Sequence, residues 1–352
     1  MTTREPVRVA IIGCGLIGTE WDRTVPTDMP PLTHARAFIQ HPRAQVVALC
    51  DRDTKRARDA ANYWHVAHAY TDPEQLFAEH NIDVVVIATP STVRWAVIEP
   101  ALAAGIKLLV IEKPLATSLE ESHRLVTAID AAGARAIINY SRNWDPSMRE
   151  LRDRIEAGSM GKMQRIIGTY GKGINNNGSH LIDLTGLLCS ASPLRARALD
   201  SPLDVSEADW SPTGERAWDA QVEFIDVNGD SINLTLLGTD HRAFTCFELR
   251  AIGRKAIFEL SMGGRVLNWI ELQNDPHFPG YTVPASSSTL KACYLEAMQE
   301  MADEVIRLAR GETTTVSCNA HRALRTALTI EAIQQSFKND CRWVTLDSLN
   351  GN

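Results

Sequence analysis

The chain has 352 residues, enough for about two domains, and its 44% hydrophobic and 22% charged residues are typical of a globular protein with a substantial core. A formal net charge of −7 argues against a nucleic-acid-binding surface, and no apolar run approaches the roughly 20 residues of a membrane span. The N-terminus lacks an apolar leader, and seven cysteines without a C-x-x-C pair argue against a disulfide framework or a zinc site. We therefore expect a reduced, cytoplasmic protein with no bound metal and no nucleic-acid or membrane partner.

The chain opens with a strand and a glycine-rich turn. Residues 7–12 form a nearly continuous β-branched run, which is typical of a strand buried on both faces of a parallel sheet. Gly13, Gly15 and Gly18 follow with the G-x-G-x-x-G spacing, and Leu16 and Ile17 lie between them. In such a turn the three glycines allow a tight bend, close approach of a pyrophosphate, and close packing of the next helix, whose N-terminus faces the phosphates. The pattern predicts a dinucleotide site.

An insertion of roughly a dozen residues interrupts the segment after Gly18. Residues 19–33 contain three prolines, which a regular helix does not tolerate, and a helical pattern resumes only at residues 34–39. Two interpretations are open. The insertion is either a plain surface loop, or its residues Trp21, Asp22 and Arg23 form a wall of the cofactor or substrate pocket.

The second strand, residues 45–51, ends in a carboxylate. Asp51 lies 33 residues beyond Gly18, and removal of the insertion restores the usual spacing of about 20 residues to an acid that binds the adenosine ribose. A carboxylate at this position repels a 2′-phosphate and favours NAD over NADP. Arg52 and the basic residues of the following helix keep NADP open as an alternative.

Alternation of strands and helices continues to about residue 140. Strands are expected at 82–88, 107–111 and 136–140, with one helix at 92–104 that ends at Gly105 and another that begins after Ser118. This order predicts a doubly wound parallel sheet, the Rossmann arrangement, with ligands at the carboxyl ends of its strands. The candidate cofactor residues at these ends are Gly13, Gly15, Leu16, Ile17, Gly18, Asp51, Arg52, Thr89, Pro90, Glu112 and Lys113.

The remainder of the chain predicts a different architecture. A helix at 146–157, a strand at 163–170, a turn at 175–178 and a helix at 180–189 capped by Ser179 precede extended runs at 217–225, 230–237, 244–251, 254–260 and 265–272. Strands in series indicate a large, mostly antiparallel sheet in an α+β domain. Helices at about 289–310 and 319–337 end the pattern. We expect domains at 1–142 and 143–352, with the last helix able to pack back on the first domain.

Two groups of residues could carry chemistry. Lys113 follows a buried strand and could hydrogen-bond a substrate oxygen beside a nicotinamide, or could simply pair with Glu112. His180 and Asp183 share one helical face, and a histidine in a first turn is favoured as a neutral base. The alternatives are a core histidine and an aspartate that complements the helix dipole.

Several motifs, in order from Gly13 to about Phe337, resemble the Gfo/Idh/MocA family of glucose–fructose oxidoreductase, inositol dehydrogenase and the MocA proteins. Residues 112–114 resemble its Glu-Lys-Pro signature, and residues 139–146, with Arg142, resemble its Tyr, Arg and Pro junction. Residues 151–161 resemble the following helix and turn, and residues 176–183 its Asp-x-x-x-His-x-x-Asp segment.

The resemblance implies a nicotinamide-dependent oxidoreductase that acts on a secondary hydroxyl of a sugar, sugar nucleotide or cyclitol. His180 would be the general acid/base and Lys113 its electrostatic partner, with Asn176 and Asp183 beside them. The substrate site would contain Lys113, Arg142, Lys172, Asn176 and His180. The large sheet would form the interface of a homodimer or homotetramer.

Two departures from the family pattern bear on function. Asn176 replaces the aspartate that orients the histidine, and an amide can fix the ring tautomer but cannot stabilise its charge, a role open to Asp183. Arg94 stands where many relatives have a histidine and, with Lys172, would favour an anionic substrate such as a nucleotide diphosphate or a uronate.

Two further functions stay open. An enzyme that retains NAD could use transient oxidation for elimination, hydrolysis or epimerisation of a sugar. A non-catalytic regulator of the same fold could sense the dinucleotide, although the presence of both Lys113 and His180 argues against it.

Overall fold

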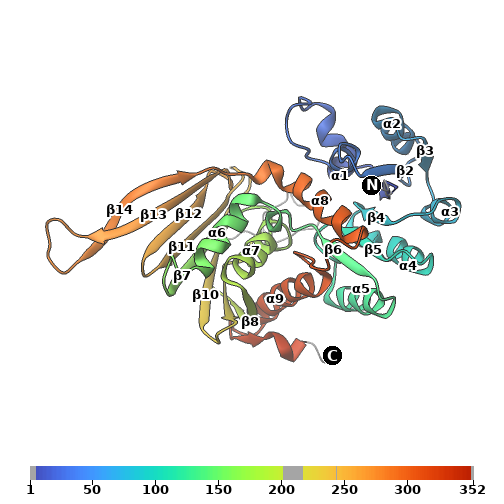
Figure 1. The fold of residues 1–352 in the computed structure, drawn as a ribbon. Helices are drawn as coiled ribbons and strands as arrows, with labels where there is room; N and C mark the ends of the chain where they lie inside the picture. The colour runs from blue at the N-terminus through green and yellow to red at the C-terminus, as the bar shows by residue number, and fades with distance from the viewer. Residues whose placement is uncertain (1–4, 201–216, 243, 350–352) are drawn as a thin grey trace. The chain divides into compact units, whose positions relative to one another are not determined.

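The computed structural model describes residues 5–200, 217–242 and 244–349, and it contains two sheets (Figure 1). The chain divides into two compact units. The first comprises Met1–Asp145 and Leu295–Leu324, and the second comprises Pro146–Tyr294 and Arg325–Asn352. None of the described helices combines the length and apolar character that crossing a membrane requires.

The first unit contains a six-stranded parallel sheet with strand order β3-β2-β1-β4-β5-β6. Its strands are β1 (Val7–Ile12), β2 (Ala44–Cys50), β3 (His68–Tyr70), β4 (Val84–Ile87), β5 (Leu108–Ile111) and β6 (Arg135–Ile138). Every residue of β4 and β5 is buried, as their unbroken apolar runs require. The order reverses at β1, so the predicted doubly wound sheet is confirmed.

Helices connect these strands, and the helices fall into two groups according to which of them contact one another. The helices are α1 (His34–Ile39), α2 (Thr54–Trp64), α3 (Pro73–Glu79), α4 (Trp95–Ala103) and α5 (Leu119–Ala131). α1 contacts α2, whereas α3, α4 and α5 contact one another in series. Right-handed crossovers on either side of β1 place connecting helices on opposite faces of the sheet. The predicted cap of α5 is confirmed, because the Ser118 hydroxyl accepts a hydrogen bond from the Glu121 N–H at 3.1 Å.

The C-terminal part of the first unit returns to the sheet. α8 (Ala297–Ala309) contacts α1, and Ile138 of β6 donates its N–H to the carbonyl of Cys318. α9 (Ala320–Lys338) then begins in the first unit and continues into the second. The helix predicted at 289–310 is wrong in its first part. Residues up to Leu290 belong to a strand, because their backbone pairs with a neighbouring strand.

The second unit contains a nine-stranded sheet with strand order β14-β13-β12-β11-β7-β10-β9-β8-β15. The strands are β7 (Met163–Tyr170), β8 (Ala191–Ala198), β9 (Ala220–Asp226), β10 (Ser231–Gly238), β11 (Phe247–Gly253), β12 (Ala256–Ser261), β13 (Val266–Asn274), β14 (Thr282–Leu290) and β15 (Val344–Thr345). β7 pairs with β10 in parallel, and the other pairs between described strands are antiparallel. The predicted mostly antiparallel sheet is confirmed, although β8, β14 and β15 were not foreseen.

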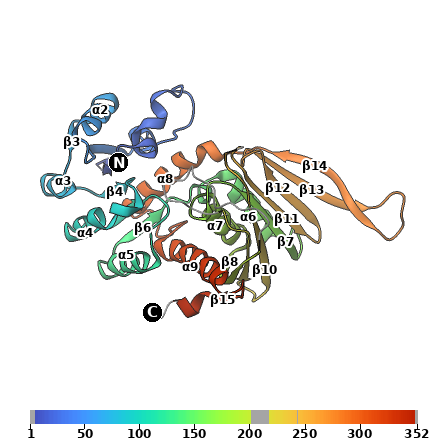
Figure 2. The same ribbon diagram turned by 180° about the vertical axis from the view of Figure 1, so that it is seen from behind.

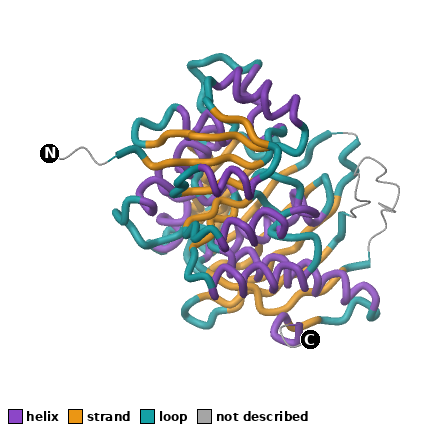
Figure 3. The backbone as a smooth tube through the Cα atoms, turned by 90° about the vertical axis from the view of Figure 1, so that its right-hand side faces the viewer, coloured by secondary structure: helices purple, strands orange, loops and turns teal. Residues whose placement is uncertain are grey.

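Helices cover one face of this sheet (Figures 1 and 2). α6 (Pro146–Glu156) packs on α7 (Ser179–Cys189), and α7 lies so close to β7 that a Cβ at Gly168 would be 2.9 Å from Leu181. The later part of α9 contacts β8, where Ser336 accepts the N–H of Ala198. Figure 3 shows helices running alongside strands in a view turned by 90° from that of Figure 1. Residues that point away from the helices, such as Leu237 of β10, are partly exposed.

Candidate active site

The turn after β1 has the close contacts that its glycines permit. Gly13 has a φ of +104°, and a Cβ there would lie 2.7 Å from the carbonyl group of Ala88. A Cβ at Gly18 would overlap the Gly13 carbonyl oxygen. Gly15 differs, because a Cβ there would meet nothing within 4 Å, so its backbone faces open space. The turn therefore packs tightly against the sheet and leaves one side open.

Asp51 joins the end of β2 to this turn. Its carboxylate accepts the Cys14 N–H at 2.9 Å and the Asp53 N–H at 3.0 Å, and the Arg56 guanidinium lies 3.5 Å away. The residue is 8% exposed. The acid that the spacing predicted thus lies beside the glycine turn, and Arg52 next to it is exposed.

The helix expected after the glycine turn is reduced to short turns. Leu16–Glu20 form a single π-helical turn and Trp21–Arg23 a 3₁₀ turn, and the N–H groups of Thr19 and Glu20 both donate to the carbonyl of Gly15. Leu16 is exposed and Ile17 half-buried. The regular helix α1 begins only at His34, because the proline-rich insertion separates it from the turn.

A buried ion pair organises the insertion. The carboxylate of Asp22, which is 3% exposed, lies 3.1 Å from the Arg36 guanidinium and also accepts the N–H and hydroxyl of Thr33 at 2.7 and 2.6 Å. The same guanidinium donates to three carbonyls of the insertion, those of Pro26, Thr27 and Met29. The Asp22 carboxylate therefore stabilises the conformation of the insertion.

The two residues beside Asp22 differ in their surroundings. Arg23 pairs with Glu20 at 2.8 Å and lies 5.0 Å over the Tyr63 ring. Trp21 is 47% exposed. These contacts favour the surface-loop interpretation for Asp22 and Arg23, and Trp21 keeps the pocket-wall hypothesis open.

At the end of β5, the carboxylate of Glu112 is buried in a polar network. Its Oε1 lies 2.8 Å from the His34 Nε2 and accepts the Asn139 amide N–H at 2.6 Å. Burial alone would raise the pKa of Glu112, but the His34 ring, the Asn139 amide and the positive charge of Lys113 hold that pKa below its usual range. The carboxylate links α1, β5 and the end of β6, and so fixes the strand end that carries Lys113.

Lys113 is half-buried at the carboxyl edge of the sheet, and its peptide bond to Pro114 is cis. On the neighbouring strand end, Thr89 is half-buried and Pro90 exposed. Arg94, which the sequence suggested as an anion-binding group, is 2% exposed and faces backbone carbonyls. Its contacts point to a role within the protein rather than on a ligand.

In the second unit the segment after β7 departs from the prediction. Ile174–Gly178 form a π-helical turn instead of a reverse turn, and α7 continues directly from it. Ser179 does not cap α7, because its hydroxyl donates to the carbonyls of Asn175 and Asn176 at 2.9 and 2.7 Å. His180 therefore follows a helical turn, and the argument from an isolated helix N-terminus does not hold for it.

His180 and Asp183 both lie on α7, as predicted. His180 is half-buried, with its ring centroid 6.4 Å from that of Phe247 in an edge-on contact. Asp183 is 3% exposed. Asn176 lies in the π-helical turn that precedes His180, and Lys172, with a φ of +65°, lies between β7 and that turn. Burial and then the positive charge of Lys172 lower the pKa of His241 in the same unit.

The junction motif has structural contacts in the first unit. Arg142 is 6% exposed and lies 4.0 Å from the Asp145 carboxylate. The Trp144 indole donates to Glu304 of α8 at 2.9 Å, and Glu304 also accepts the Ser317 N–H at 2.8 Å. These bonds tie the end of the first stretch of this unit to its C-terminal return.

Each unit thus assembles part of the predicted site. In the first, the glycine turn, Asp51, Thr89, Glu112 and Lys113 all lie at the carboxyl ends of β1, β2, β4 and β5. In the second, Lys172, Asn176, His180 and Asp183 lie on one segment that leads from β7 into α7.

Sequence reasoning did not assign His34 and Asn139, which hold Glu112. One signal was available for Asn139, a polar residue directly after a buried strand. Pairing of His34 with a residue 78 positions later has no local signal.

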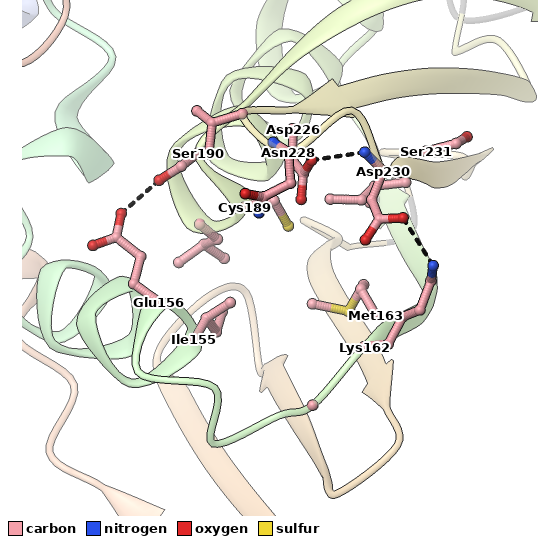
Figure 4. A pocket seen from close by; sticks show the side chains of 14 residues that line it. Ile155, Glu156, Lys162, Met163, Cys189, Ser190, Asp226, Asn228, Asp230 and Ser231 are labelled. Carbon is pink, nitrogen blue, oxygen red and sulfur yellow. Dashed lines mark hydrogen bonds and ion pairs between the residues drawn. The ribbon is translucent and has the colours of Figure 1, made fainter.

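A cavity of about 360 Å³ lies in the second unit, at the end of α7 opposite His180 (Figure 4). Its polar groups already bond one another: Lys162 pairs with Asp230 at 2.8 Å, and the Ser190 hydroxyl donates to Glu156 at 2.5 Å. It contains none of the predicted site residues. Among the described residues, no group of three or more His, Cys, Asp or Glu side chains could hold a metal ion.

Comparison with known proteins agrees with the fold of the first unit. Residues 7–140 match the family model described as an oxidoreductase family with an NAD-binding Rossmann fold. This stretch is therefore a Gfo/Idh/MocA NAD-binding domain. The predicted resemblance is confirmed, and the first unit carries a Gfo/Idh/MocA NAD-binding domain.

Among curated Gfo/Idh/MocA relatives, an inositol 2-dehydrogenase of Saccharopolyspora erythraea is 33% identical over 164 residues, 46% of this chain and 44% of the relative. A D-apiose dehydrogenase of Paraburkholderia graminis is 26% identical over 160 residues, 46% of this chain and 39% of the relative. The chain thus matches less than half the length of these relatives. The crystal structure of an inositol dehydrogenase homologue with NAD⁺ from Azotobacter vinelandii covers 97% of both chains with a TM-score of 0.72 and 18% identity, which shows the shared fold.

Proposed function

We propose that the protein is an NAD-dependent oxidoreductase that moves a hydride between nicotinamide and a secondary hydroxyl or keto carbon of a sugar, sugar nucleotide or cyclitol. One observation carries the proposal. A Rossmann sheet of the NAD-binding family brings a glycine turn, an acid at the end of β2 and a lysine at the end of β5 to one edge.

The residues of the first unit fit NAD. The open space at Gly15 would admit a pyrophosphate to the backbone N–H groups of the turn, with Leu16 and Ile17 beside it. Asp51, with Arg52 next to it, would bind the ribose hydroxyls, and its negative charge favours NAD over NADP. Thr89, Pro90, Glu112 and Lys113 would border the nicotinamide end. When bound, NAD supplies the acceptor for a hydride from the carbinol carbon.

Lys113 and His180 would act on the substrate oxygen. Lys113 would donate a hydrogen bond to that oxygen and stabilise the negative charge that develops on it. His180 would take the hydroxyl proton during oxidation and return a proton during reduction. Asn176 would orient the imidazole by a hydrogen bond, and Asp183, buried on the same helix, would supply the negative charge that an amide lacks. Arg142 and Lys172 would complete the substrate site.

The relatives support a small polyol as substrate. Two of the curated proteins that match are named as inositol 2-dehydrogenase and D-apiose dehydrogenase, which act on a cyclitol and a sugar. We infer a substrate of this class for the present protein. Lys172 adds a positive charge to the segment that leads to His180, so acidic sugars and sugar nucleotides belong in the first screen.

The test is to incubate the protein with NAD and a panel of cyclitols, free sugars, uronates and sugar nucleotides while the absorbance of reduced nicotinamide is followed. For Lys113→Ala we expect a loss of at least 100-fold in kcat, about the effect of removing one charge-stabilising donor, with NAD binding retained. Lys107→Ala is the matched control, because that exposed lysine bonds the carbonyl of Ala132 near the other end of β5. NADH formation by Lys113→Ala at the wild-type rate would refute the assigned role.

A further inference from the structure

Arg94 is one of the largest fully buried side chains of the protein. It directly precedes α4, after the Thr89-Pro90 pair and the 3₁₀ turn Ser91–Val93, and it is 2% exposed. An arginine is rarely buried to this extent unless its charge is paired. The position of this side chain therefore calls for a physical explanation.

The guanidinium connects the ends of two neighbouring strands. Its Nη2 lies 3.3 Å from the carbonyl oxygen of Thr89, which follows β4, and 3.5 Å from the carbonyl oxygen of Lys113, which follows β5. Both contacts are long for hydrogen bonds. Nε and Nη1 are buried and have no hydrogen-bond partner among the described residues. The guanidinium therefore lies against backbone carbonyls, and the N–H groups of its Nε and Nη1 are not used in hydrogen bonds to described residues.

The charge of Arg94 lacks a contact partner of opposite sign. Within the described part of the chain, no carboxylate lies within ion-pair distance of it, and Glu112 is the foremost negative group that acts on it at longer range. Burial lowers the pKa of Arg94 to about 10, which leaves the group positively charged at neutral pH. A fixed positive charge is thus held next to the backbone of Lys113.

We infer that Arg94 is a positioning residue for Lys113, which holds the ends of β4 and β5 together through their carbonyls and adds a buried positive charge to that edge. The inference rests on the proposed function, in which Lys113 stabilises negative charge on the substrate oxygen. Arg94 itself is too deeply buried to contact a substrate. Its Nη2 contacts carbonyls of two different strand ends, and the rigid guanidinium holds that nitrogen in place, whereas a lysine ammonium would sit on a flexible stem.

Replacement of Arg94 should affect the chemical step of the proposed reaction. Loss of the guanidinium would let the Lys113 backbone shift and would remove charge that favours a developing oxyanion. A shift of about 1 Å in a catalytic group can cost on the order of 100-fold in rate. The effect would fall on kcat and on its pH dependence, whereas the affinity for NADH, set by the glycine turn and Asp51, would stay the same.

The first measurement requires no substrate. Amide hydrogen exchange of the NADH-bound protein is compared for wild type, Arg94→Gln, Arg94→Lys and the control Arg124→Gln, an exposed arginine that stacks on Trp95 of α4. We expect faster exchange in peptides that cover residues 108–116 for Arg94→Gln, a smaller change for Arg94→Lys and none for Arg124→Gln. Wild-type exchange in a folded Arg94→Gln protein would overturn the inference.

The second measurement uses a substrate from the screen. We expect Arg94→Gln to lower kcat at least 10-fold, to shift the pH profile of kcat and to leave the Kd for NADH within twofold, with partial recovery in Arg94→Lys. If Arg94→Gln does not fold, the kcat and pH profile of Arg94→Lys test the inference. A folded lysine variant with wild-type kcat and pH profile overturns the inference, and a slowed variant with a shifted profile supports it.

Lys113→Ala in the same series separates the two proposals. If Lys113→Ala is inactive while the Arg94 variants behave as wild type, only the positioning role fails. If Lys113→Ala keeps the wild-type kcat, the proposed function of Lys113 fails, whatever the Arg94 variants do.

Discussion

At the scale of single residues, two backbone N–H groups and the nearby Arg56 guanidinium explain how the Asp51 carboxylate can be buried. Its carboxylate accepts backbone N–H groups of Cys14 and Asp53, so it fixes the glycine turn to the end of β2. A carboxylate held in this way costs no further ordering when ribose hydroxyls approach it. The Glu112 carboxylate differs, because the side chains of His34 and Asn139 bond it within the protein.

For Asp51→Ala we expect a fall of about tenfold or more in the preference for NAD over NADP, because a charge-assisted hydrogen bond and the repulsion of a 2′-phosphate are lost together. Cofactor-induced shifts in the thermal midpoint, at several concentrations of each dinucleotide, report the ratio. Asp53→Ala is the control, since that exposed carboxylate caps α2 through the Arg56 N–H. An unchanged ratio in Asp51→Ala would remove Asp51 from the ribose site.

At the scale of elements, the insertion after the glycine turn is a loop with its own polar core. Three prolines prevent a helix, and the Asp22–Arg36 pair replaces helical hydrogen bonds with side-chain contacts to loop backbone. Because Arg36 lies on α1, the pair also fixes the loop to the helix that follows it. The insertion is therefore a structural part of the nucleotide-binding edge.

For Asp22→Asn we expect the free energy of unfolding to fall by about 3 kcal/mol, because the buried Arg36 guanidinium would lose its counter-charge. Urea unfolding followed by circular dichroism measures the change. Asp28→Asn, in an exposed part of the same insertion, should leave the transition in place. Equal stability of the two variants would show that the ion pair does not organise the loop.

At the scale of the whole molecule, the nine-stranded sheet has one face covered by helices and one face over which no described helix lies (Figure 2). Leu237 of β10 is 37% exposed on the uncovered face, and Ile167 and Ile252 on neighbouring strands are half-buried there. On this face they alternate with exposed charged side chains such as Arg165 and Arg250. The expectation of a homodimer or homotetramer therefore rests on the family resemblance.

We predict that light scattering of the wild-type protein at micromolar concentration will give the mass of a dimer or tetramer. Leu237→Arg should shift the mass toward the monomer, because a charge would be buried at the interface. Val227→Arg is the matched control, as Val227 is 84% exposed in the turn between β9 and β10. A monomeric wild-type protein would contradict the prediction, and so would a Leu237→Arg protein of unchanged mass.

Local sequence signals predicted much of the fold. The runs at 7–12 and 163–170 match β1 and β7, and Ser118 caps α5 as its spacing predicted. β14 was missed because its polar, exposed residues lack an apolar alternation, and β8 because Pro193 lies within it. The helix cap at Ser179 was wrong because a π-helical turn precedes α7, and the Asn-rich sequence there reads equally well as a reverse turn.

The sequence by itself determined the βα order, the glycine turn, the acid at the end of β2 and the lysine after β5, because these depend on residue types at short spacing. Only the tertiary structure decided the contacts of buried charges. Asp22 with Arg36, His34 with Glu112, and Arg94 with the Thr89 and Lys113 carbonyls are brought together by the packing of separate elements. Burial of a charge requires a partner, and which partner it finds depends on the three-dimensional arrangement of the strand ends.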